Sequence, residues 1–381
     1  MILSETKENA WESHIFNDYG NVLGKRIVIR VDWNMPIKNG TIIDTTRADV
    51  TFPFLHKLLD SGAKLVILSH FGEKGESLEP IAHYVQKEFP TFSFTKTLDF
   101  TTLARESESL LNGSGMILEN VRLWQGETEC LPSLSSSFAS LGDIFINDAF
   151  SVSHRNHSSV VGIAKLLPSY LGPTCTDELS HLQKALLPVL PALLIVGGAK
   201  ISTKLPLIKH YLDLGVKVFV GGGMVHNIWK EQGFSIGDSF CDRAYHVPPF
   251  FLNHPLLLTP SDVKLDTGEV VEYTEIPQHG VVVDLGTKSI EELSTLIASV
   301  QTVIINGPLG LYEKGWLLGT EKVLQSIAHS HAFSYIGGGD TVTVANNLNI
   351  HDKFTFVSLG GGAMLDYLSS GTLPGIDVVT K

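Results

Sequence analysis

The sequence contains little cysteine and no long apolar run. Its three cysteines, Cys130, Cys175 and Cys241, lie far apart and form no Cys-x-x-Cys pair. This spacing argues against a disulfide framework or a structural zinc site and fits a reducing compartment. No apolar run approaches the roughly 18 residues of a membrane span, and residues 1–16 have no long apolar core of the kind found in signal peptides. We therefore expect a cytoplasmic protein that does not bind membranes.

Positive charge is also scarce. Lysine and arginine total 28 against 40 aspartates and glutamates, which gives a formal net charge of −12. Such a balance disfavours nucleic acid as a partner, although a small anionic ligand responds to local charge and remains compatible with it. The length of 381 residues, the 43% hydrophobic content and a mean hydropathy of +0.15 are typical of a globular protein with room for two medium-sized domains.

The two common nucleotide-binding fingerprints are missing. The sequence has no G-x-x-x-x-G-K-[ST], which excludes a P-loop protein, and no strand-borne G-x-G-x-x-G, which weighs against a dehydrogenase.

Short apolar runs recur along the chain without strict alternation, as in strands covered on both faces. We predict strands in the first half at 26–31, 64–68, 115–118 and 143–147, and in the second half at 193–196, 216–220, 281–285, 302–306, 333–336 and 354–357.

Helical periodicity fills the segments between these strands. Apolar residues recur at helical spacing at Leu78, Ala82, Val85 and Phe89, and again at Ile290, Leu293, Ile297 and Val300. Ser61-Gly62 predicts the end of a helix that follows Thr51. Repeated alternation of strand and helix predicts an α/β fold with two Rossmann-like lobes, each a parallel sheet wrapped by helices and joined by a hinge. We place the boundary near 175–190, so that the lobes span residues 1–180 and 181–364.

Polar residues follow the predicted strands, and they differ between the halves. Ligands of open α/β sheets bind beyond the carboxyl ends of the strands. Basic and hydrogen-bonding residues end the strands of the first half, whereas glycine clusters end those of the second half: 196–200, 220–224, 336–340 and 359–363. A single cluster is equally typical of a turn that needs positive φ, but four clusters after apolar strands favour a phosphate-binding function.

Charged residues beside the glycine clusters suggest phosphate chemistry. Lys200 and Lys204 are four residues apart, and we expect both on one face at a helix start, within reach of phosphates. Asp340 follows three glycines and suits Mg²⁺, which takes one or two carboxylates together with phosphate oxygens; the alternative is a helix N-cap.

The basic residues of the first half suit an anionic acid. Arg47, Arg122 and Arg155 each lie near a predicted strand end, and arginine binds phosphate and carboxylate through its planar fork. Each arginine alone is also compatible with a surface ion pair. His70 and His154 are candidates for further hydrogen bonds or charge. Asp32 and Asn34 follow the predicted strand 26–31 and are candidates for holding a substrate hydroxyl.

These segments resemble the phosphoglycerate kinase family from about residue 20 to the C-terminus. The matching motifs occur in the family's order: VDWNMP (31–36), TTRAD (45–49), SHFG (69–72), ILENVRLWQGE (117–127), NDAFSVSHRNHSSVVG (147–162), GGAKISTK (197–204), VGGGM (220–224), NGPLGLYE (306–313), GGGDT (337–341) and LGGGAML (359–365).

The resemblance implies an acid-binding N-terminal lobe, a nucleotide-binding C-terminal lobe, and a C-terminal tail from about 365 to 381 that packs on the first lobe. It implies a 3-phosphoglycerate site made of Asp32, Asn34, Arg47, His70, Arg122, His154 and Arg155. It implies an ATP/ADP site made of Gly198, Lys200, Lys204, Gly221, Gly222, Asn306, Pro308, Gly310, Glu313, Gly338, Gly339, Asp340 and Thr341, with Mg²⁺ on Asp340. Arg47, Lys200, Gly338 and Gly361 would be catalytic.

The implied reaction is reversible phosphoryl transfer between 1,3-bisphosphoglycerate and ADP, in glycolysis and gluconeogenesis, by a hinge-bending monomer. Two departures leave an alternative open. Glu73 stands where the family has an arginine, with Lys74 next to it as partial compensation, and Leu359 replaces a hydroxyl residue. The alternative is a catalytically weakened nucleotide-binding paralogue with a regulatory or binding role.

Overall fold

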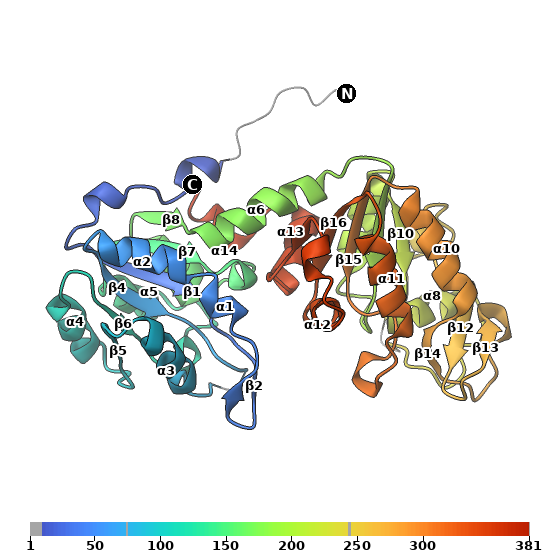
Figure 1. The fold of residues 1–381 in the computed structure, drawn as a ribbon, viewed down its shortest axis with the longest axis horizontal. Coiled ribbons are helices and arrows are strands. Elements are labelled where there is room, and N and C mark those ends of the chain that lie inside the picture. The colour runs from blue at the N-terminus through green and yellow to red at the C-terminus, as the bar shows by residue number, and fades with distance from the viewer. Residues whose placement is uncertain (1–9, 74, 243–244, 381) are drawn as a thin grey trace. The chain divides into compact units, whose positions relative to one another are not determined.

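The computed structural model describes residues 10–73, 75–242 and 245–380, which divide into two compact units. Unit 1 comprises the described residues up to Ser180 together with those from Thr372 onward, and unit 2 comprises His181–Gly371. Each unit is built on its own six-stranded parallel sheet (Figure 1), so the predicted α/β class is confirmed. Lys74 lies outside the described residues. No helix in the described part of the chain is long and apolar enough to cross a membrane.

The sheet of unit 1 has the strand order β5-β6-β4-β1-β7-β8. Its strands are β1 (Arg26–Val31), β4 (Lys64–Leu68), β5 (Phe92–Phe94), β6 (Gly115–Ile117), β7 (Ile144–Asp148) and β8 (Ser169–Leu171). The predicted strands at 26–31 and 64–68 are confirmed residue for residue, whereas the short β5 and β8 were not predicted. A two-stranded hairpin, β2 (Ile37–Lys38) and β3 (Thr41–Ile42), turns at Asn39-Gly40, where both residues have positive φ.

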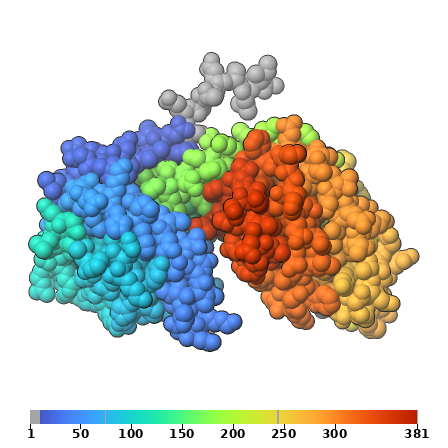
Figure 2. Space-filling model, viewed as in Figure 1, coloured from blue at the N-terminus to red at the C-terminus, as the bar shows by residue number. Residues whose placement is uncertain are grey.

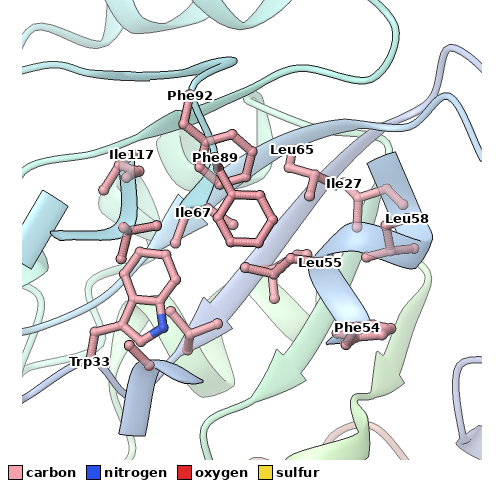
Figure 3. Packing of buried hydrophobic residues seen from close by; sticks show 14 of the residues in the cluster. Ile27, Trp33, Phe54, Leu55, Leu58, Leu65, Ile67, Phe89, Phe92 and Ile117 are labelled. Atoms are coloured by element: carbon pink, nitrogen blue, oxygen red, sulfur yellow. The ribbon is translucent and has the colours of Figure 1, made fainter. Parts of the chain in front are cut away.

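The helices of unit 1 are α1 (Thr46–Asp49), α2 (Phe52–Asp60), α3 (Glu79–Glu88), α4 (Phe100–Ser109), α5 (Pro132–Ala139), the N-terminal part of α6 (Pro173–Leu186), and α14 (Pro374–Asp377). Figure 3 shows Leu55 and Leu58 of α2 packed with Ile27 and Leu65 of the sheet, and Phe89 lies in the same cluster. Alternate strand residues such as Val28 and Val66 point to the opposite face and are equally buried. Burial on both faces explains why these strands are apolar throughout.

The C-terminal segment of unit 1 is held at the end of β7. The backbone N–H of Gly375 donates to the Ser153 carbonyl at 2.8 Å, and Asn147 Nδ2 donates to the Gly375 carbonyl at 3.0 Å. A side chain at Gly375 would meet the Ser153 backbone, so a residue larger than glycine would disturb this contact.

The sheet of unit 2 has the strand order β11-β10-β9-β15-β16-β17. Its strands are β9 (Ala192–Val196), β10 (Lys217–Val220), β11 (Leu257–Leu258), β15 (Thr302–Asn306), β16 (Phe333–Gly337) and β17 (Phe356–Val357). Its helices are the C-terminal part of α6, α7 (Leu205–Asp213), α8 (Val225–Glu231), α9 (Pro249–Leu252), α10 (Thr287–Ala298), α11 (Leu318–Ala328), α12 (Gly339–Asn347) and α13 (Gly362–Ser370).

Three helices of unit 2 share one core with its sheet. Leu293 of α10, Val323 of α11 and Val344 of α12 are buried in the same cluster as Leu193 of β9 and Val303 of β15. In the space-filling view the orange and red atoms of the segment after residue 280 form much of the visible face of this unit (Figure 2).

One predicted strand belongs to a different sheet. The run 281–285 forms β14 (Val282–Leu285), which pairs antiparallel with β12 (Asp262–Leu265), and β12 pairs antiparallel with β13 (Val270–Glu272). The prediction of a parallel strand here was therefore wrong. A tight turn at Thr267-Gly268 joins β12 to β13, and that hairpin offers β14 an edge outside the parallel sheet.

Candidate active site

Each parallel sheet has a switch point, at which the chain leaves two neighbouring strands in opposite directions along the sheet. In unit 1 this point lies between β1 and β7, and in unit 2 it lies between β9 and β15. Loops at the carboxyl ends of strands diverge at such a switch point and leave a crevice for ligands. The residues predicted from the sequence follow these strands and their neighbours.

Asp32 joins three strand ends of unit 1. It follows β1 directly, its carboxylate pairs with the Arg47 guanidinium of α1, and it accepts a hydrogen bond from the Ser151 hydroxyl that follows β7. His70, which follows β4, places Nδ1 3.7 Å from Asp32 Oδ1. The structure therefore brings together Asp32, Arg47 and His70 as predicted. Ser151 was missed, because nothing in its sequence context distinguishes it from other loop serines.

The loop after β4 is held from two sides. Asn34 Oδ1 accepts from the backbone N–H of Gly72 at 2.9 Å, and the Arg122 side chain donates to the Gly72 carbonyl. The Arg122 backbone is itself fixed, because its N–H donates to Asn120 Oδ1 at 3.1 Å. Glu73 follows in this loop, and its negative charge favours the charged form of the Arg122 side chain.

Four arginines act electrostatically on His70. Burial holds the pKa of His70 well below its usual value, and Arg30, Arg122, Arg155 and Arg47 lower it further in that order. They come from β1, the loops after β6 and β7, and α1. His70 is therefore neutral near pH 7 and contributes hydrogen bonds rather than charge. The three predicted arginines, Arg47, Arg122 and Arg155, therefore all lie within electrostatic reach of one histidine.

Arg30 was not predicted, although it is the most buried of these arginines, with 1% of its surface exposed. Its Nε donates to Ser159 Oγ at 3.1 Å, and another nitrogen donates to the Val31 carbonyl. Ser159 in turn donates through its hydroxyl and its backbone N–H to Glu127, at 2.5 and 3.0 Å. Burial lowers the pKa of Arg30 to about 10, against the opposing influence of Glu127. The available signal was a charged residue inside the apolar strand 26–31.

A hollow of about 560 Å³ opens beside this cluster. It is lined by Glu73, Gly75, Arg122, Thr128, Arg155 and His157. Of the predicted acid-site residues, Arg122 and Arg155 reach it, while Asp32, Asn34, Arg47, His70 and His154 do not line it. The Arg155 Nε donates to His154 Nε2 at 3.4 Å, which connects His154 to the hollow. Two guanidinium groups and one carboxylate thus share the hollow.

The four glycine clusters of unit 2 follow β9, β10, β16 and β17, and so lie along the carboxyl edge of one sheet. In each cluster the second glycine has positive φ: Gly198 (98°), Gly222 (61°), Gly338 (92°) and Gly361 (53°). Every cluster therefore contains a turn of the kind that needs glycine. Helices α12 and α13 begin immediately after Gly338 and Gly361, so their first backbone N–H groups are presented at this edge.

Backbone packs directly on backbone where two clusters meet. A Cβ at Gly222 would lie 2.8 Å from the Gly198 nitrogen. The Gly198 N–H donates to the Pro308 carbonyl at 2.9 Å, and the Gly197 N–H donates to the Asn306 carbonyl at 2.9 Å. Close approach is thus a second reason for glycine, separate from the turn.

A cavity of about 540 Å³ lies over this backbone floor. Five predicted nucleotide-site residues line it: Gly198, Gly222, Pro308, Gly310 and Glu313. The remaining predicted residues do not line it: Lys200, Lys204, Gly221, Asn306, Gly338, Gly339, Asp340, Thr341 and Gly361. Much of the wall is apolar and comes from β12, β14 and the segment 308–311. His226, Asp238 and Phe240 also line the cavity, and no pattern in the sequence predicted them.

Lys200 and Lys204 were predicted to lie on one face of a helix, and this prediction was wrong. Helix α7 begins only at Leu205, and residues 201–204 form a turn. Pro206 lies in the first turn of α7, where proline is tolerated because the N–H groups there have no partner within the helix. Lys200 is exposed, whereas Lys204 Nζ donates to the Gly197 carbonyl at 2.8 Å and to Asn306 Oδ1 at 3.1 Å. Burial lowers the pKa of Lys204 to about 8.

Asp340 and Thr341 occupy the first turn of α12. The N-cap is Gly338, so the alternative of Asp340 as an N-cap is wrong. The pKa of Asp340 is raised by partial burial and then by Glu313, which places a second carboxylate within electrostatic reach. Thr341 is buried, and its hydroxyl accepts from the Gly307 N–H at 3.1 Å. The described residues contain no cluster of three or more His, Cys, Asp or Glu side chains that would hold a metal alone.

Known proteins resemble the chain over almost its whole length. The phosphoglycerate kinase family model matches residues 17–371. The phosphoglycerate kinase of Bartonella tribocorum is 36% identical, with 93% of this chain and 96% of the relative covered, and that of Chelativorans sp. is 34% identical, with 96% and 98% covered. A solved phosphoglycerate kinase from Coxiella burnetii superposes with a TM-score of 0.80 at 32% identity, covering 94% of this chain and 97% of that one. The chain therefore belongs to the phosphoglycerate kinase family.

Proposed function

We propose that the protein catalyses reversible phosphoryl transfer between 1,3-bisphosphoglycerate and ADP, giving 3-phosphoglycerate and ATP. The observation that carries the proposal is the pairing of two unlike sites, each at the carboxyl edge of its own parallel sheet. Unit 1 gathers arginines around a neutral histidine, and unit 2 has a cavity over glycine backbone. A cytoplasmic, monomeric enzyme of glycolysis and gluconeogenesis is part of this proposal.

In the proposed acid site, charge and hydrogen bonding are divided among the strand ends. Arg122 and Arg155, which line the hollow, would bind the phosphate of the acid together with His154. Asp32 and Asn34 would hold the hydroxyl, and the neutral ring of His70 would add a hydrogen bond. Arg47 is paired with Asp32, and its positive charge would act on the transferring phosphoryl group.

In the proposed nucleotide site, the cavity would take the base and Glu313 the ribose hydroxyls. The glycines of the floor and helix starts would approach the nucleotide closely: Gly198, Gly221, Gly222, Gly310, Gly338, Gly339 and Gly361. Asn306, Pro308 and Thr341 would fix the loops that surround it. Lys204 is bound to the Gly197 and Asn306 oxygens and would hold the phosphate-binding loop, while the exposed Lys200 would contact the transferring group.

The donor set near the phosphates suits Mg²⁺. Mg²⁺ prefers one or two carboxylates together with phosphate oxygens and water, and the Asp340 carboxylate in the first turn of α12 provides one. Asp340 would hold the ion, which would neutralise charge on the nucleotide phosphates when bound.

The reaction requires no general base. An oxygen of the ADP β-phosphate attacks the phosphorus of the acyl phosphate, the bond from phosphorus to the carboxyl oxygen breaks, and a carboxylate leaves; both oxygens are already ionised near pH 7. The residues therefore have to align the reactants and neutralise charge. Because the proposed ligands bind different units, transfer would require hinge closure during the cycle, which would also exclude water from the acyl phosphate.

A coupled assay with 3-phosphoglycerate and MgATP tests the proposal. We expect turnover by the wild-type protein, and a fall in kcat of about 100-fold or more in Lys200→Ala with little change in nucleotide affinity. Lys217→Ala is the matched control, since Lys217 is exposed at the amino end of β10. Tight ATP binding without turnover would instead favour the nucleotide-binding paralogue, and near-wild-type kcat in Lys200→Ala would refute the role given to this lysine.

A further inference from the structure

One buried amide bridges two points of the loop that follows β4. Asn120 follows β6, and none of its surface is exposed. Its Nδ2 donates to the carbonyl oxygens of Phe71 and Glu76, at 2.6 and 2.7 Å. Its Oδ1 accepts from the backbone N–H of Arg122 at 3.1 Å. Both amide hydrogens and the amide oxygen are therefore used.

The three contacts of Asn120 require an amide. A carbonyl oxygen only accepts and a backbone N–H only donates, so the NH₂ group must face Phe71 and Glu76 while the oxygen faces Arg122. An ionised aspartate has the same size but supplies acceptors alone, and it would face two carbonyl oxygens without a proton to donate. The site thus selects asparagine for its hydrogen bonds as well as for its volume.

The bridged loop forms part of the acid hollow of unit 1. Glu73 and Gly75 lie between the two bridged residues in the sequence, and both line the hollow. Arg122 lines it as well, and its side chain donates to the Gly72 carbonyl in the same loop. Three of the six lining residues are therefore held through Asn120, which does not line the hollow itself.

The residue before Asn120 fixes the end of the same loop. Glu119 is buried, and its Oε1 accepts from the backbone N–H of Leu78 at 2.7 Å. Its Oε2 accepts from the Ser77 hydroxyl at 2.8 Å. Leu78 is the N-cap of α3, so the loop is already fixed where that helix begins. Glu119 therefore holds the end of the loop, and Asn120 holds the part that reaches the hollow.

We propose that Asn120 is a positioning residue for the acid, which holds the Arg122 cation and the Glu73 carboxylate at the hollow so that both charges act on the bound phosphate. This role rests on the proposed function to the extent that the hollow binds the phosphate of 3-phosphoglycerate. A side chain that only stabilised unit 1 would leave the affinity of the folded protein unchanged. A positioning residue changes that affinity and also determines how strongly Glu73 acts on the ligand.

Isothermal titration calorimetry of 3-phosphoglycerate into the full chain at low ionic strength tests the proposal. Asn120→Ala should raise the Kd about tenfold, because Arg122 loses its fixed position. Glu73→Gln should lower the Kd about fivefold in the wild type but less than about twofold in the Asn120→Ala background, where the carboxylate is no longer held at the hollow. Asn120→Asp lacks both donors and should weaken binding at least as much as Asn120→Ala.

Two control variants remove comparable buried hydrogen bonds elsewhere. In unit 2, Asn227 Nδ2 donates to the carbonyl oxygens of Asp242 and Tyr245, at 2.8 and 3.2 Å, and Asn227→Ala should leave the Kd for 3-phosphoglycerate unchanged. In unit 1, the buried Ser107 hydroxyl donates to the Leu141 carbonyl at 2.6 Å. Ser107→Ala should lower the free energy of unfolding by about 1 kcal/mol without changing this Kd.

Two binding results would overturn the assignment. One is a Kd in folded Asn120→Ala no weaker than that in Ser107→Ala, and the other is an effect of Glu73→Gln that is the same in both backgrounds. If Asn120→Ala does not fold, Asn120→Asp takes its place in each comparison.

Amide hydrogen exchange without ligand tests the bridge separately from binding. Exchange at Gly72 should be faster in the Asn120 variants than in the wild type, and an unchanged rate would contradict the role of Asn120 in holding the loop. A wild type that binds no 3-phosphoglycerate would count against the proposed function, and the exchange rate at Gly72 would still decide whether Asn120 holds the loop.

Discussion

The two candidate sites differ in whether side chains or backbone form them. In unit 1 the site consists of charged and hydrogen-bonding side chains, and Asp32, Arg47 and the neutral His70 reach one another from separate strand ends and a helix. In unit 2 the floor consists of backbone, and Gly222 lies so close to Gly198 that no Cβ fits between them. A site of side chains is disrupted by removing charge, whereas a site of backbone is disrupted by adding atoms. The units should therefore respond to opposite kinds of substitution.

The largest effect is expected for Arg47→Ala. The substitution removes the cation proposed to act on the transferring group and leaves the buried Asp32 carboxylate without its guanidinium partner. We expect kcat in the coupled assay to fall by about 100-fold to 1,000-fold, with the KM for MgATP nearly unchanged. Arg105→Ala removes an exposed arginine of α4 and should leave kcat as in the wild type. Near-wild-type kcat in Arg47→Ala would contradict the charge-based account of unit 1.

The second largest effect is expected for Gly222→Ala, in the backbone floor of the unit 2 cavity. The new Cβ would meet the Gly198 nitrogen, and the residue would retain a strained positive φ. We expect the Kd for ADP to rise by about tenfold or more and the free energy of unfolding to fall by about 1–2 kcal/mol.

Gly233→Ala is the matched control for Gly222→Ala. Gly233 also has positive φ (88°), but nothing lies within 4 Å of the Cβ position. It should lose stability through backbone strain alone and keep its affinity for ADP. Equal losses of ADP affinity in both variants would show that close approach at Gly222 is unimportant.

A smaller effect is expected for Glu73→Gln, which sharpens the picture of the acid site. The Glu73 carboxylate lines the hollow with Arg122 and Arg155 and should oppose an incoming phosphate. We expect the KM for 3-phosphoglycerate to fall about fivefold at low ionic strength and by less at high salt, because salt screens exposed charges. Glu108→Gln removes an exposed charge of the same unit from α4 and should change neither value. An unchanged KM in Glu73→Gln would show that this carboxylate does not act on the substrate.

The last prediction concerns stability against acid, with no expected effect on kcat or ligand binding at pH 7. Burial and then Arg30, Arg155, Arg122 and His154 lower the pKa of His157 to about 4, which outweighs the attraction of Glu127 at 3.7 Å. The unfolded chain, with a pKa of about 6.5 for this histidine, therefore binds more protons between pH 6.5 and 4. Stability contributed by neutral His157 is present above pH 6.5 and is lost as pH falls through that window.

Amide hydrogen exchange in unit 1, measured at pH 7 and at pH 4.5, gives the contribution of His157 to the free energy of unfolding. Between pH 7 and pH 4.5 the free energy of unfolding should fall by about 2 kcal/mol more in the wild type than in His157→Gln. His83→Gln, on exposed α3 surface, should behave as the wild type. Identical pH dependence in wild type and His157→Gln would show that this histidine is not held neutral.

The sequence predicted the parts of the fold that depend on local pattern. Strands such as 26–31, 64–68 and 302–306 are mostly apolar because they are covered on both faces, and their bounds agree with the structure. The run at 281–285 is equally apolar, yet it pairs with a hairpin rather than with the parallel sheet. Pairing partners are a long-range property, and a run of valines does not specify them.

Prediction of the sites had the same limit. Residue types at strand ends identified Asp32, Arg47, His70, Arg122 and Arg155, which the structure brings into one cluster. The prediction for Lys200 and Lys204 assumed helical spacing between them. It was wrong because the helix starts later, with Pro206 in its first turn. His226 and Ser151 carry no local signal, since the feature that distinguishes each one is its neighbour in space.

Equilibrium binding of both ligands to two variants tests the central claim most directly. 3-Phosphoglycerate and ADP are titrated separately into Arg47→Ala and Gly222→Ala by isothermal titration calorimetry. We expect Arg47→Ala to weaken the binding of 3-phosphoglycerate while ADP binds as in the wild type, and Gly222→Ala to show the reverse pattern. Loss of both ligands by the same factor in either folded variant would contradict two separately built sites.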